Sequence, residues 1–436
     1  MKLKKSIISL LLVTMLSGLL VGCGTNKEPN NNNNNTNNNN NNNTTPATTN
    51  AEITLSVWNE PNANDELNMY LQAEKATGIK VNINVIPESD YSSKLNQMVS
   101  TKDTSSDIYV VWENDIKNFA DAKGILSLDD YLANSTINQK DFIDAVNQLT
   151  KGLGATYGLP WCAATEVLYY NQDMFDAAGI DYPNNDWSYD DFLAAAEKLT
   201  KYNDDGTTAV YGFDIPNTQT WWAGIGGAGD QVYDASTGEL VIGDGAVSFI
   251  TDCANLVKKG VMPEPSSDTS DKFASGKAAM SWLGSWNIGS YSDKLAFNWD
   301  IATIPTDKIK YNTLHTGFYT INANSKNKDA AWKVIEWLMG EEGQAINSKA
   351  SGNPSALKTI ADKGDWKVEA ATTIENWDAV TDSLAAGVFG YTCLPSGVTN
   401  NAISLFNTAL LGDITPEKAV NEAMKYAAET IGYTLK

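Results

Sequence analysis

The sequence predicts an α/β protein built from two open sheets in two lobes. Short runs of β-branched and aromatic residues alternate with longer capped, amphipathic segments, which is the pattern of strand–helix–strand units. The chain has 436 residues, 42% of them hydrophobic and 19% charged, which suits a globular protein of two or more domains. Residues 158–173 place a proline turn between two extended runs, as expected where a chain crosses between two bodies.

The first residues have the pattern of an export signal. Three lysines within the first five residues precede an apolar run at 7–20 that is too short for a stable membrane span. Small residues then lead to Cys23, a pattern that resembles a lipobox. We expect residues 1–22 to be removed and Cys23 to carry a lipid. The alternative is an ordinary signal peptide with a chance cysteine.

Residues 23–51 are predicted to form a disordered tether. The segment is mostly asparagine and threonine, so it has little apolar surface to offset its ordering entropy. A flexible chain of this kind spans roughly 5–6 Å × √n, which would hold the folded body some tens of Å from a membrane.

The first folded segment predicts a βαβ unit. Apolar and polar residues alternate from Ile53 to Val57, a helical pattern closes at Gly78, and alternation resumes at Val81. Such a unit has a right-handed crossover and parallel strands, and ligands sit beyond the carboxyl ends of such strands. We expect strands at 53–57, 81–85 and 108–112, and helices at 67–77 and 91–100.

The rest of the chain continues the alternation. Asp173 is expected to cap a helix that begins near Met174. Further strands are expected to end at 214 and to span 167–170, 281–286, 299–304 and 315–321. Further helices are expected to end at 200, to start at 287 and 416, and to span 247–259, 329–339, 366–382 and 401–411. Three crossings near 162–167, 304–306 and 352–354 then give an N-terminal lobe of 52–162 and 305–352 and a C-terminal lobe of 163–304 and 353–436.

Charge restricts the class of ligand. The formal net charge is -22, which disfavours nucleic acid as a partner because its binding depends on Lys and Arg meeting phosphate. All 31 basic residues are lysine, so no guanidinium can clamp a carboxylate or phosphate in bidentate fashion. The sequence therefore favours a neutral ligand. A bias against arginine codons is the alternative explanation.

The sequence offers little for catalysis, a metal or a cofactor. His315 is the single histidine, and no nucleophile in a recognisable elbow lies near it in sequence. A zinc site needs several close His or Cys ligands, and residues 203–206 predict a β-turn rather than a full calcium loop. We therefore expect no cofactor and no metal. Cys162, Cys253 and Cys393 are an odd set, and we expect them to be free or buried thiols.

Several motifs together resemble a known family. Their order along nearly the whole mature chain is similar to that of the bacterial extracellular solute-binding proteins that deliver oligosaccharides to ABC importers. That resemblance implies two α/β lobes joined by a hinge of three crossings, with the sugar between them. The segments that carry it are ITLSVWNEP with TGIKVNINVIP, SSDIYVVWENDIKNFADAKGIL, GLP followed by a tyrosine-rich strand and NQDMF, WSYDDFLAAAEKLT, FASGKAAMSWLGSW and NSKNKDAAWKVIEWLMGEEGQ.

The resemblance also implies a ligand site. Trp286 matches the tryptophan that stacks on sugar in the family, and aromatic rings beside carboxylates or amides suit the CH faces and hydroxyls of a sugar. Ile116 stands where maltose-binding members carry an arginine, so the resemblance does not extend to maltose specificity. The implied contacts are Asn59, Glu60, Trp112 and Asp115 from the first lobe, Trp161 and Glu166 at the crossing, Trp221 or Trp222 and Trp286 from the second lobe, and Tyr391 from the last loop.

The sequence thus predicts a monomeric, lipid-anchored binding protein on the outer face of the cytoplasmic membrane. It would hold a neutral oligosaccharide, pass it to the permease subunits of an ABC importer and catalyse nothing. The alternative is a glycosidase that uses two carboxylates at about 5–9.5 Å, drawn from Glu60, Asp115 and Glu166. A purely structural adhesin is a third possibility, which the hinge-like crossings disfavour.

Overall fold

The computed structural model describes most of the chain beyond the tether. The described residues are 51–144, 146, 153–216, 220–230, 242–266, 270–369, 371–390 and 394–431. Residues 48–436 group together as one compact unit. The predicted signal peptide, Cys23 and nearly all of the tether lie outside the described residues. Within the described ranges, no helix is both long enough and apolar enough to cross a membrane.

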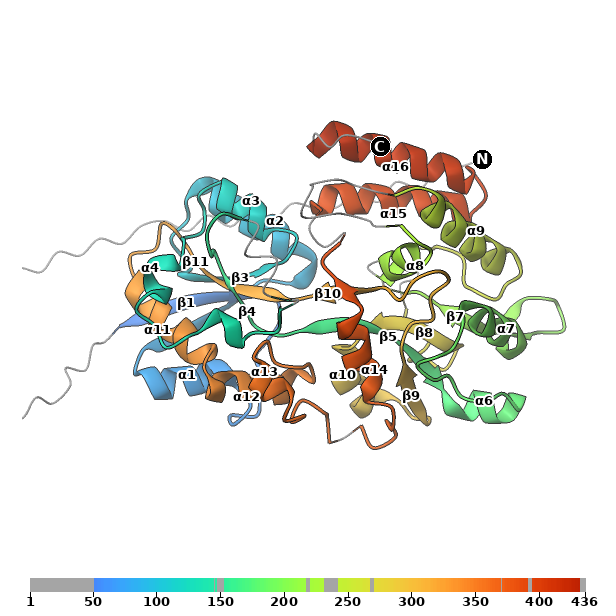
Figure 1. Cartoon of the computed structure of the whole chain (residues 1–436), viewed down its shortest axis with the longest axis horizontal. Coiled ribbons are helices and arrows are strands. Elements are labelled where there is room, and N and C mark those ends of the chain that lie inside the picture. The colour runs from blue at the N-terminus through green and yellow to red at the C-terminus, as the bar shows by residue number, and fades with distance from the viewer. Residues whose placement is uncertain are drawn as a thin grey trace, which may run out of the picture. The chain divides into compact units, whose positions relative to one another are not determined.

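A five-stranded sheet forms the first lobe of the folded unit (Figure 1). Its strand order is β2-β1-β3-β11-β4. β1 pairs in parallel with β2 and β3, whereas β11 runs antiparallel to β3 and β4, so the carboxyl ends of β1, β3 and β4 meet at one edge. The bounds are β1 Glu52–Val57, β2 Lys80–Val85, β3 Ile108–Trp112, β4 Leu159–Pro160 and β11 Gly317–Ile321.

Helices cover the first sheet and bury two apolar clusters. Leu55 and Val110 pack with Val334 in one cluster, and Tyr91 packs with Phe119 in another. Gly78 ends α1 in the left-handed region at φ 69°, as predicted. The helix begins at Met69 rather than at 67, because the Asn68 side chain accepts from the Leu71 N–H. The helices are α1 Met69–Thr77, α2 Glu88–Thr101, α3 Ile116–Asp121, α4 Asp129–Leu132, α11 Lys328–Leu338, α12 Glu341–Ser351 and α13 Lys358–Ala361, with a 3-10 turn at Gln139–Asp141.

A second sheet forms the second lobe, with β5 near its centre. The order is β12-β10-β5-β8-β7-β6, and β9 also pairs with β5. Every residue of β5 is buried, which explains its continuous apolar and aromatic run. The bounds are β5 Ala164–Asn171, β6 Lys201–Tyr202, β7 Thr208–Asp214, β8 Ala278–Gly284, β9 Trp299–Ala302, β10 Asn312–His315 and β12 Gly387–Val388.

The second lobe has its own helices and cores. Ser188 and Asp191 form a capping box at the start of α7, the helix that was expected to end at 200. Helices α9, α15 and α16 lie side by side in Figure 1 and share one apolar cluster. The helices are α6 Gln172–Ala178, α7 Tyr189–Leu199, α8 Trp221–Gly227, α9 Asp244–Lys258, α10 Asn287–Lys294, α14 Asp378–Ala385, α15 Ser396–Leu410 and α16 Pro416–Ile431. The two-lobed α/β prediction is confirmed.

The strand expected at 315–321 is wrong, because the chain changes sheet within it. His315 ends β10, which pairs with β5, and Gly317 begins β11, which pairs with β3. The second crossing is therefore the single residue Thr316 rather than 304–306. Residues 312–315 belong to the second sheet, contrary to the expected lobe boundary at 305. Side-chain alternation is unaffected by a change of pairing partner, so periodicity gave no sign of it.

The third crossing also ends later than expected. The Ala163 N–H donates to the Pro354 carbonyl at 2.9 Å, so this part of the chain does lie against the first crossing. Leu357 and Ile360 then return to the core of the first lobe, and Trp366 is the first large side chain in the core of the second. Residues 353–361 thus pack with the first lobe, in contrast to the predicted boundary at 353.

Two local predictions were wrong for reasons of side-chain bonding. Asn171, not Asp173, caps α6, because its side chain accepts from the Met174 N–H at 3.0 Å while Asp173 bonds Asn298. The helix predicted at 366–382 is reduced to α14. The buried Asp300 carboxylate accepts from the N–H groups just before α14, which holds that stretch in turns.

Candidate functional site

Three tryptophans gather at the carboxyl edge of the first sheet. Trp58 follows β1, Trp112 ends β3 and Trp161 follows β4. The ring centroids of Trp58 and Trp112 are 3.9 Å apart, and those of Trp58 and Trp161 are 5.8 Å apart. All three side chains are half-buried. They form an aromatic surface on the first lobe beside the hinge.

A buried carboxylate lies next to this surface. Asp115 is 3% exposed, and its Oδ2 atom has no hydrogen-bond partner among the described residues. Burial raises the pKa of Asp115, and a hydrogen bond from Ser92 partly opposes that effect. Asn59 and Glu60 continue the chain beyond Trp58 and are exposed. The first lobe therefore places one buried acid and two exposed polar side chains near the aromatic surface.

Trp286 brings an aromatic ring from the second lobe. It follows β8, which ends two residues earlier than expected, and precedes α10, which starts at 287 as predicted. Its side chain is half-buried. The ring folds back over Gly284, so closely that a Cβ atom there would lie 2.2 Å from ring atoms. It meets the His315 ring edge to face, with centroids 5.1 Å apart. The absence of a side chain at Gly284 thus leaves the space that the Trp286 ring occupies.

His315 lies between carboxylates from both lobes. Its Nδ1 atom is 2.9 Å from Oε1 of Glu113, which follows β3, and its Nε2 atom is 3.2 Å from Oε1 of Glu166 in β5. Burial lowers the pKa of His315, but the hydrogen bonds and charges of the two carboxylates outweigh this and raise it to about 9. Burial raises the pKa of Glu166, and the hydrogen bond to His315 opposes this. These three residues join the two lobes at the strand switch.

The structure brings most of the predicted first-lobe and hinge residues together. Trp112, Asp115 and Trp161 lie at one sheet edge, and Glu166 and Trp286 are linked to that edge through His315. Whether they contact a ligand stays a prediction. Tyr391 lies outside the described residues.

Trp221 and Trp222 are buried in the core in the structure. They are 2% and 1% exposed and belong to the apolar core of the second lobe. The Trp221 ring stacks on Phe406 with centroids 6.2 Å apart, and Trp222 meets the same ring edge on. Their place in the chain is explained by packing between α8 and α15. We therefore do not retain either as a ligand contact.

Sequence reasoning missed three residues of the site: Trp58, Glu113 and His315. Trp58 and Glu113 directly adjoin predicted contacts at strand ends, so the same position argument would have found them. His315 was weighed only as a catalytic base. Its role at the hinge depends on the strand switch at Thr316, for which the sequence carries no signal.

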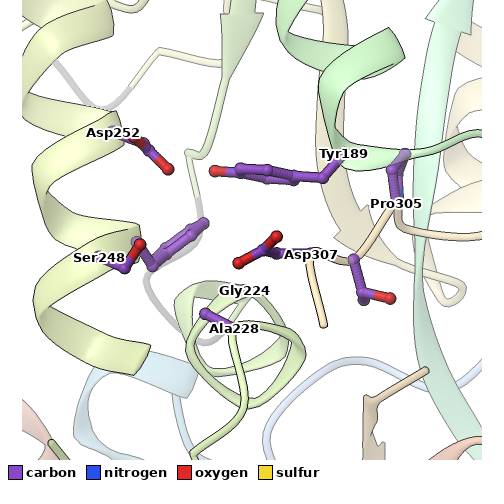
Figure 2. A pocket seen from close by; sticks show the side chains of 9 residues that line it. Tyr189, Gly224, Ala228, Ser248, Asp252, Pro305 and Asp307 are labelled. Carbon is purple, nitrogen blue, oxygen red and sulfur yellow. The ribbon is translucent and has the colours of Figure 1, made fainter. Parts of the chain in front are cut away.

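A separate small pocket lies within the second lobe. Tyr189, Asp252 and Asp307 line it, and Figure 2 shows the Tyr189 hydroxyl pointing toward the Asp252 carboxylate. Burial and the nearby Asp307 charge raise the pKa of Asp252. This pocket is built between α7, α8 and α9 and shares no lining residue with the aromatic site.

Comparisons with known proteins agree with the two-lobed α/β fold. The family model for bacterial extracellular solute-binding proteins matches residues 57–345. An erythritol/L-threitol-binding protein of Mycolicibacterium smegmatis is 26% identical over 63% of this chain and 63% of its own length. A maltooligosaccharide ABC transporter solute-binding lipoprotein of Streptococcus pneumoniae is 24% identical over 65% of this chain and 67% of its own length. The structure of a Listeria monocytogenes ABC substrate-binding protein in complex with cycloalternan has a TM-score of 0.74 at 23% identity, covering 88% of this chain and 100% of that one.

Proposed function

Because the chain belongs to the bacterial extracellular solute-binding proteins, we propose that it captures a neutral oligosaccharide between its lobes for an ABC importer. The observation that carries this is the pairing of aromatic surfaces across the hinge. Trp58, Trp112 and Trp161 lie on one side, and Trp286 lies on the other beside His315. A ligand between them would be held by flat apolar faces on both sides.

The chemistry of these side chains suits a sugar. Sugar CH faces pack on aromatic rings, and sugar hydroxyls donate to carboxylate oxygens. The Oδ2 atom of Asp115 is a buried acceptor without a partner among the described residues. An anionic ligand would meet Asp115 and Glu113 without any guanidinium to pair with, since the chain has no arginine. The site therefore favours a neutral ligand over an acidic one.

One relative and one solved structure support an oligosaccharide as the solute, whereas the mycobacterial relative is named for erythritol and L-threitol. The pneumococcal relative is named for maltooligosaccharide, and the listerial neighbour holds cycloalternan. The pneumococcal relative is also named a lipoprotein, which agrees with the lipobox-like pattern before Cys23. We propose that lipidated Cys23 and the asparagine-rich tether hold a monomeric binding protein at the outer face of the cytoplasmic membrane, where it meets the importer's permease subunits.

The glycosidase alternative has no support in these comparisons. Its three candidate acids are also not arranged alike in the structure. Glu60 is exposed, whereas Glu166 is fully buried and bound by His315.

A thermal-shift screen of neutral and acidic glycans tests the proposal. A ligand that binds only the native state raises apparent stability by RT ln(1 + [L]/Kd), about 2.7 kcal/mol at a hundredfold excess over Kd. We expect neutral oligosaccharides to raise the melting temperature, with calorimetry confirming one site. Matched uronate forms should bind more weakly. Stronger binding of a uronate than of its neutral counterpart, or no shift with any neutral glycan, would contradict the proposal.

A further inference from the structure

We call Glu113, His315 and Glu166 the hinge triad. Sugar capture alone does not explain why these three charged side chains are buried together. Its members are 8%, 8% and 0% exposed. Glu113 follows β3 in the first sheet, whereas Glu166 lies in β5 and His315 ends β10 in the second. Buried charged groups are costly unless they are paired, and here the pairing runs from one lobe to the other.

The geometry of the hinge triad suits a protonated histidine, and the Thr313 hydroxyl, 3.3 Å from Nε2, is a further partner of the ring. Each ring nitrogen faces a carboxylate oxygen, Nδ1 at 2.9 Å and Nε2 at 3.2 Å. A neutral imidazole has one N–H donor and one acceptor nitrogen, so it can donate to only one of two carboxylates. An imidazolium donates to both, and such charge-assisted bonds are stronger than neutral ones. Loss of the proton therefore leaves one carboxylate facing a lone pair.

The hinge triad lies where any rotation of the lobes must be concentrated. Oε2 of Glu113 accepts from the N–H of Thr316, the crossing residue, at 3.4 Å. The Thr316 hydroxyl donates to the carbonyl of Cys162, in the first crossing, at 2.8 Å. Hinge motion is absorbed by a few such backbone positions. The His315 ring also contacts the Trp286 ring, which links the hinge to the aromatic site.

We propose that the hinge triad is a proton-dependent brace: protonated His315 holds the two lobes in the arrangement seen here and fixes the Trp286 ring, and loss of that proton releases both. This inference rests on the proposed function, because a solute-binding protein works by moving its lobes. It makes His315 a positioning residue that acts on the ligand site through Trp286.

The direction of the pH effect follows from the neighbouring groups. Burial lowers the pKa of His315 but the two carboxylates raise it to about 9. The brace is thus complete below the ordinary histidine pKa of about 6.5 and is lost as pH rises through about 9. The other titratable groups close to the triad are Asp115 and Cys162, both near the Glu113 charge, and burial raises the pKa of both.

The first test measures the proton itself. His315 is the single histidine, so an untagged protein labelled with 13C and 15N in histidine gives one imidazole signal to titrate by NMR. We expect a midpoint near 9 in the parent and a fall of at least one pH unit, tenfold in proton affinity, in Glu113→Gln. Glu88→Gln removes an exposed carboxylate of the first lobe and should leave the midpoint unchanged. A parent midpoint at or below 6.5 overturns the proposal.

The second test measures the lobes without any ligand. Small-angle scattering should give a larger radius of gyration at pH 10 than at pH 7.5 for the parent. His315→Gln should give the larger value at both pH values, with circular dichroism confirming that each sample is folded. A radius that changes with neither pH nor this variant overturns the brace. Neither test uses a glycan. If no glycan shifts the melting temperature but the radius of gyration depends on pH, the result counts against sugar capture and not against the brace.

Discussion

Substituting Gly284 by alanine should displace the Trp286 ring without removing it. The added Cβ would lie 2.2 Å from ring atoms, whereas ordinary contacts are 3.4–4 Å, so the ring has to move by about 1.2 Å. Gly284 is not among the glycines with positive φ, so alanine itself is compatible with the backbone there. Every residue of β8 is buried, whereas the Trp286 ring is half-buried and has space beside it. We therefore expect the ring to move and the strand to stay in place.

The expected effect is on binding rather than stability. Truncating a buried aromatic anchor costs ≥ ~2 kcal/mol of binding free energy. A ring displaced by about 1 Å keeps part of its contact, so we expect a loss of about 1–2 kcal/mol, or roughly 5- to 30-fold in Kd. Replacing glycine by alanine at a compatible position changes the free energy of unfolding by only about 0.4–1 kcal/mol, in the stabilising direction. The melting temperature of Gly284→Ala should therefore not fall much.

Titration calorimetry with the glycan that gives the largest thermal shift measures this effect. The matched control is Gly289→Ala in α10, where an added Cβ meets no atom within 4 Å. A double-mutant cycle with Trp286→Ala isolates the cause, because Gly284→Ala should change binding by less than about 0.5 kcal/mol once the ring is absent. The reasoning would be refuted if Gly284→Ala left the affinity unaltered in the protein that has Trp286. It would also be refuted if Gly284→Ala weakened binding equally in the Trp286→Ala background.

Three further predictions concern the core, pH and the anchor. Trp222→Ala should lower the free energy of unfolding by ~3–5 kcal/mol in urea titrations, since the ring is 1% exposed, and a loss below ~1 kcal/mol would contradict core packing. Burial and the Asp271 charge raise the pKa of Asp214 to about 7, so its stabilising contribution is lost as pH rises through that value. Asp214→Asn should raise the melting temperature more at pH 8 than at pH 5, and the reverse order would count against this. Cys23→Ala should abolish labelling by palmitate and leave glycan affinity intact; persistent labelling would rule out Cys23 as the lipidated residue.

The absence of arginine has a consequence for specificity beyond this protein's net charge. A buried acid such as Asp115 can accept from hydroxyls of many sugars, but without a guanidinium beside it the site has no rigid bidentate donor. Discrimination would then depend on the shape of the aromatic faces. We expect affinity to differ more between glycans of different linkage than between epimers that present the same CH face.

Local sequence was sufficient for most elements and for the fold class. The alternation at 53–57, the glycine after α1 and the capping box at Ser188 each act over a few residues, so their signals are complete in the sequence. The site residues at strand ends were predictable for the same reason: parallel strands bring their carboxyl ends to one edge. That logic placed Trp112 and Asp115 correctly at the sheet edge, and it would also have reached Trp58.

Tertiary structure alone decided what depends on pairing partners. One continuous strand pattern at 315–321 splits at Thr316 because its two halves pair with different sheets, and alternation is the same in either sheet. The sequence predicted both Trp222 and Trp286 as ligand contacts, but the first ring packs on Phe406 and the second folds over Gly284. The sequence by itself thus determined the elements, the class and the chemistry available. That Trp222 is buried in the core, and which carboxylates meet His315, were settled only by contacts between residues more than a hundred positions apart.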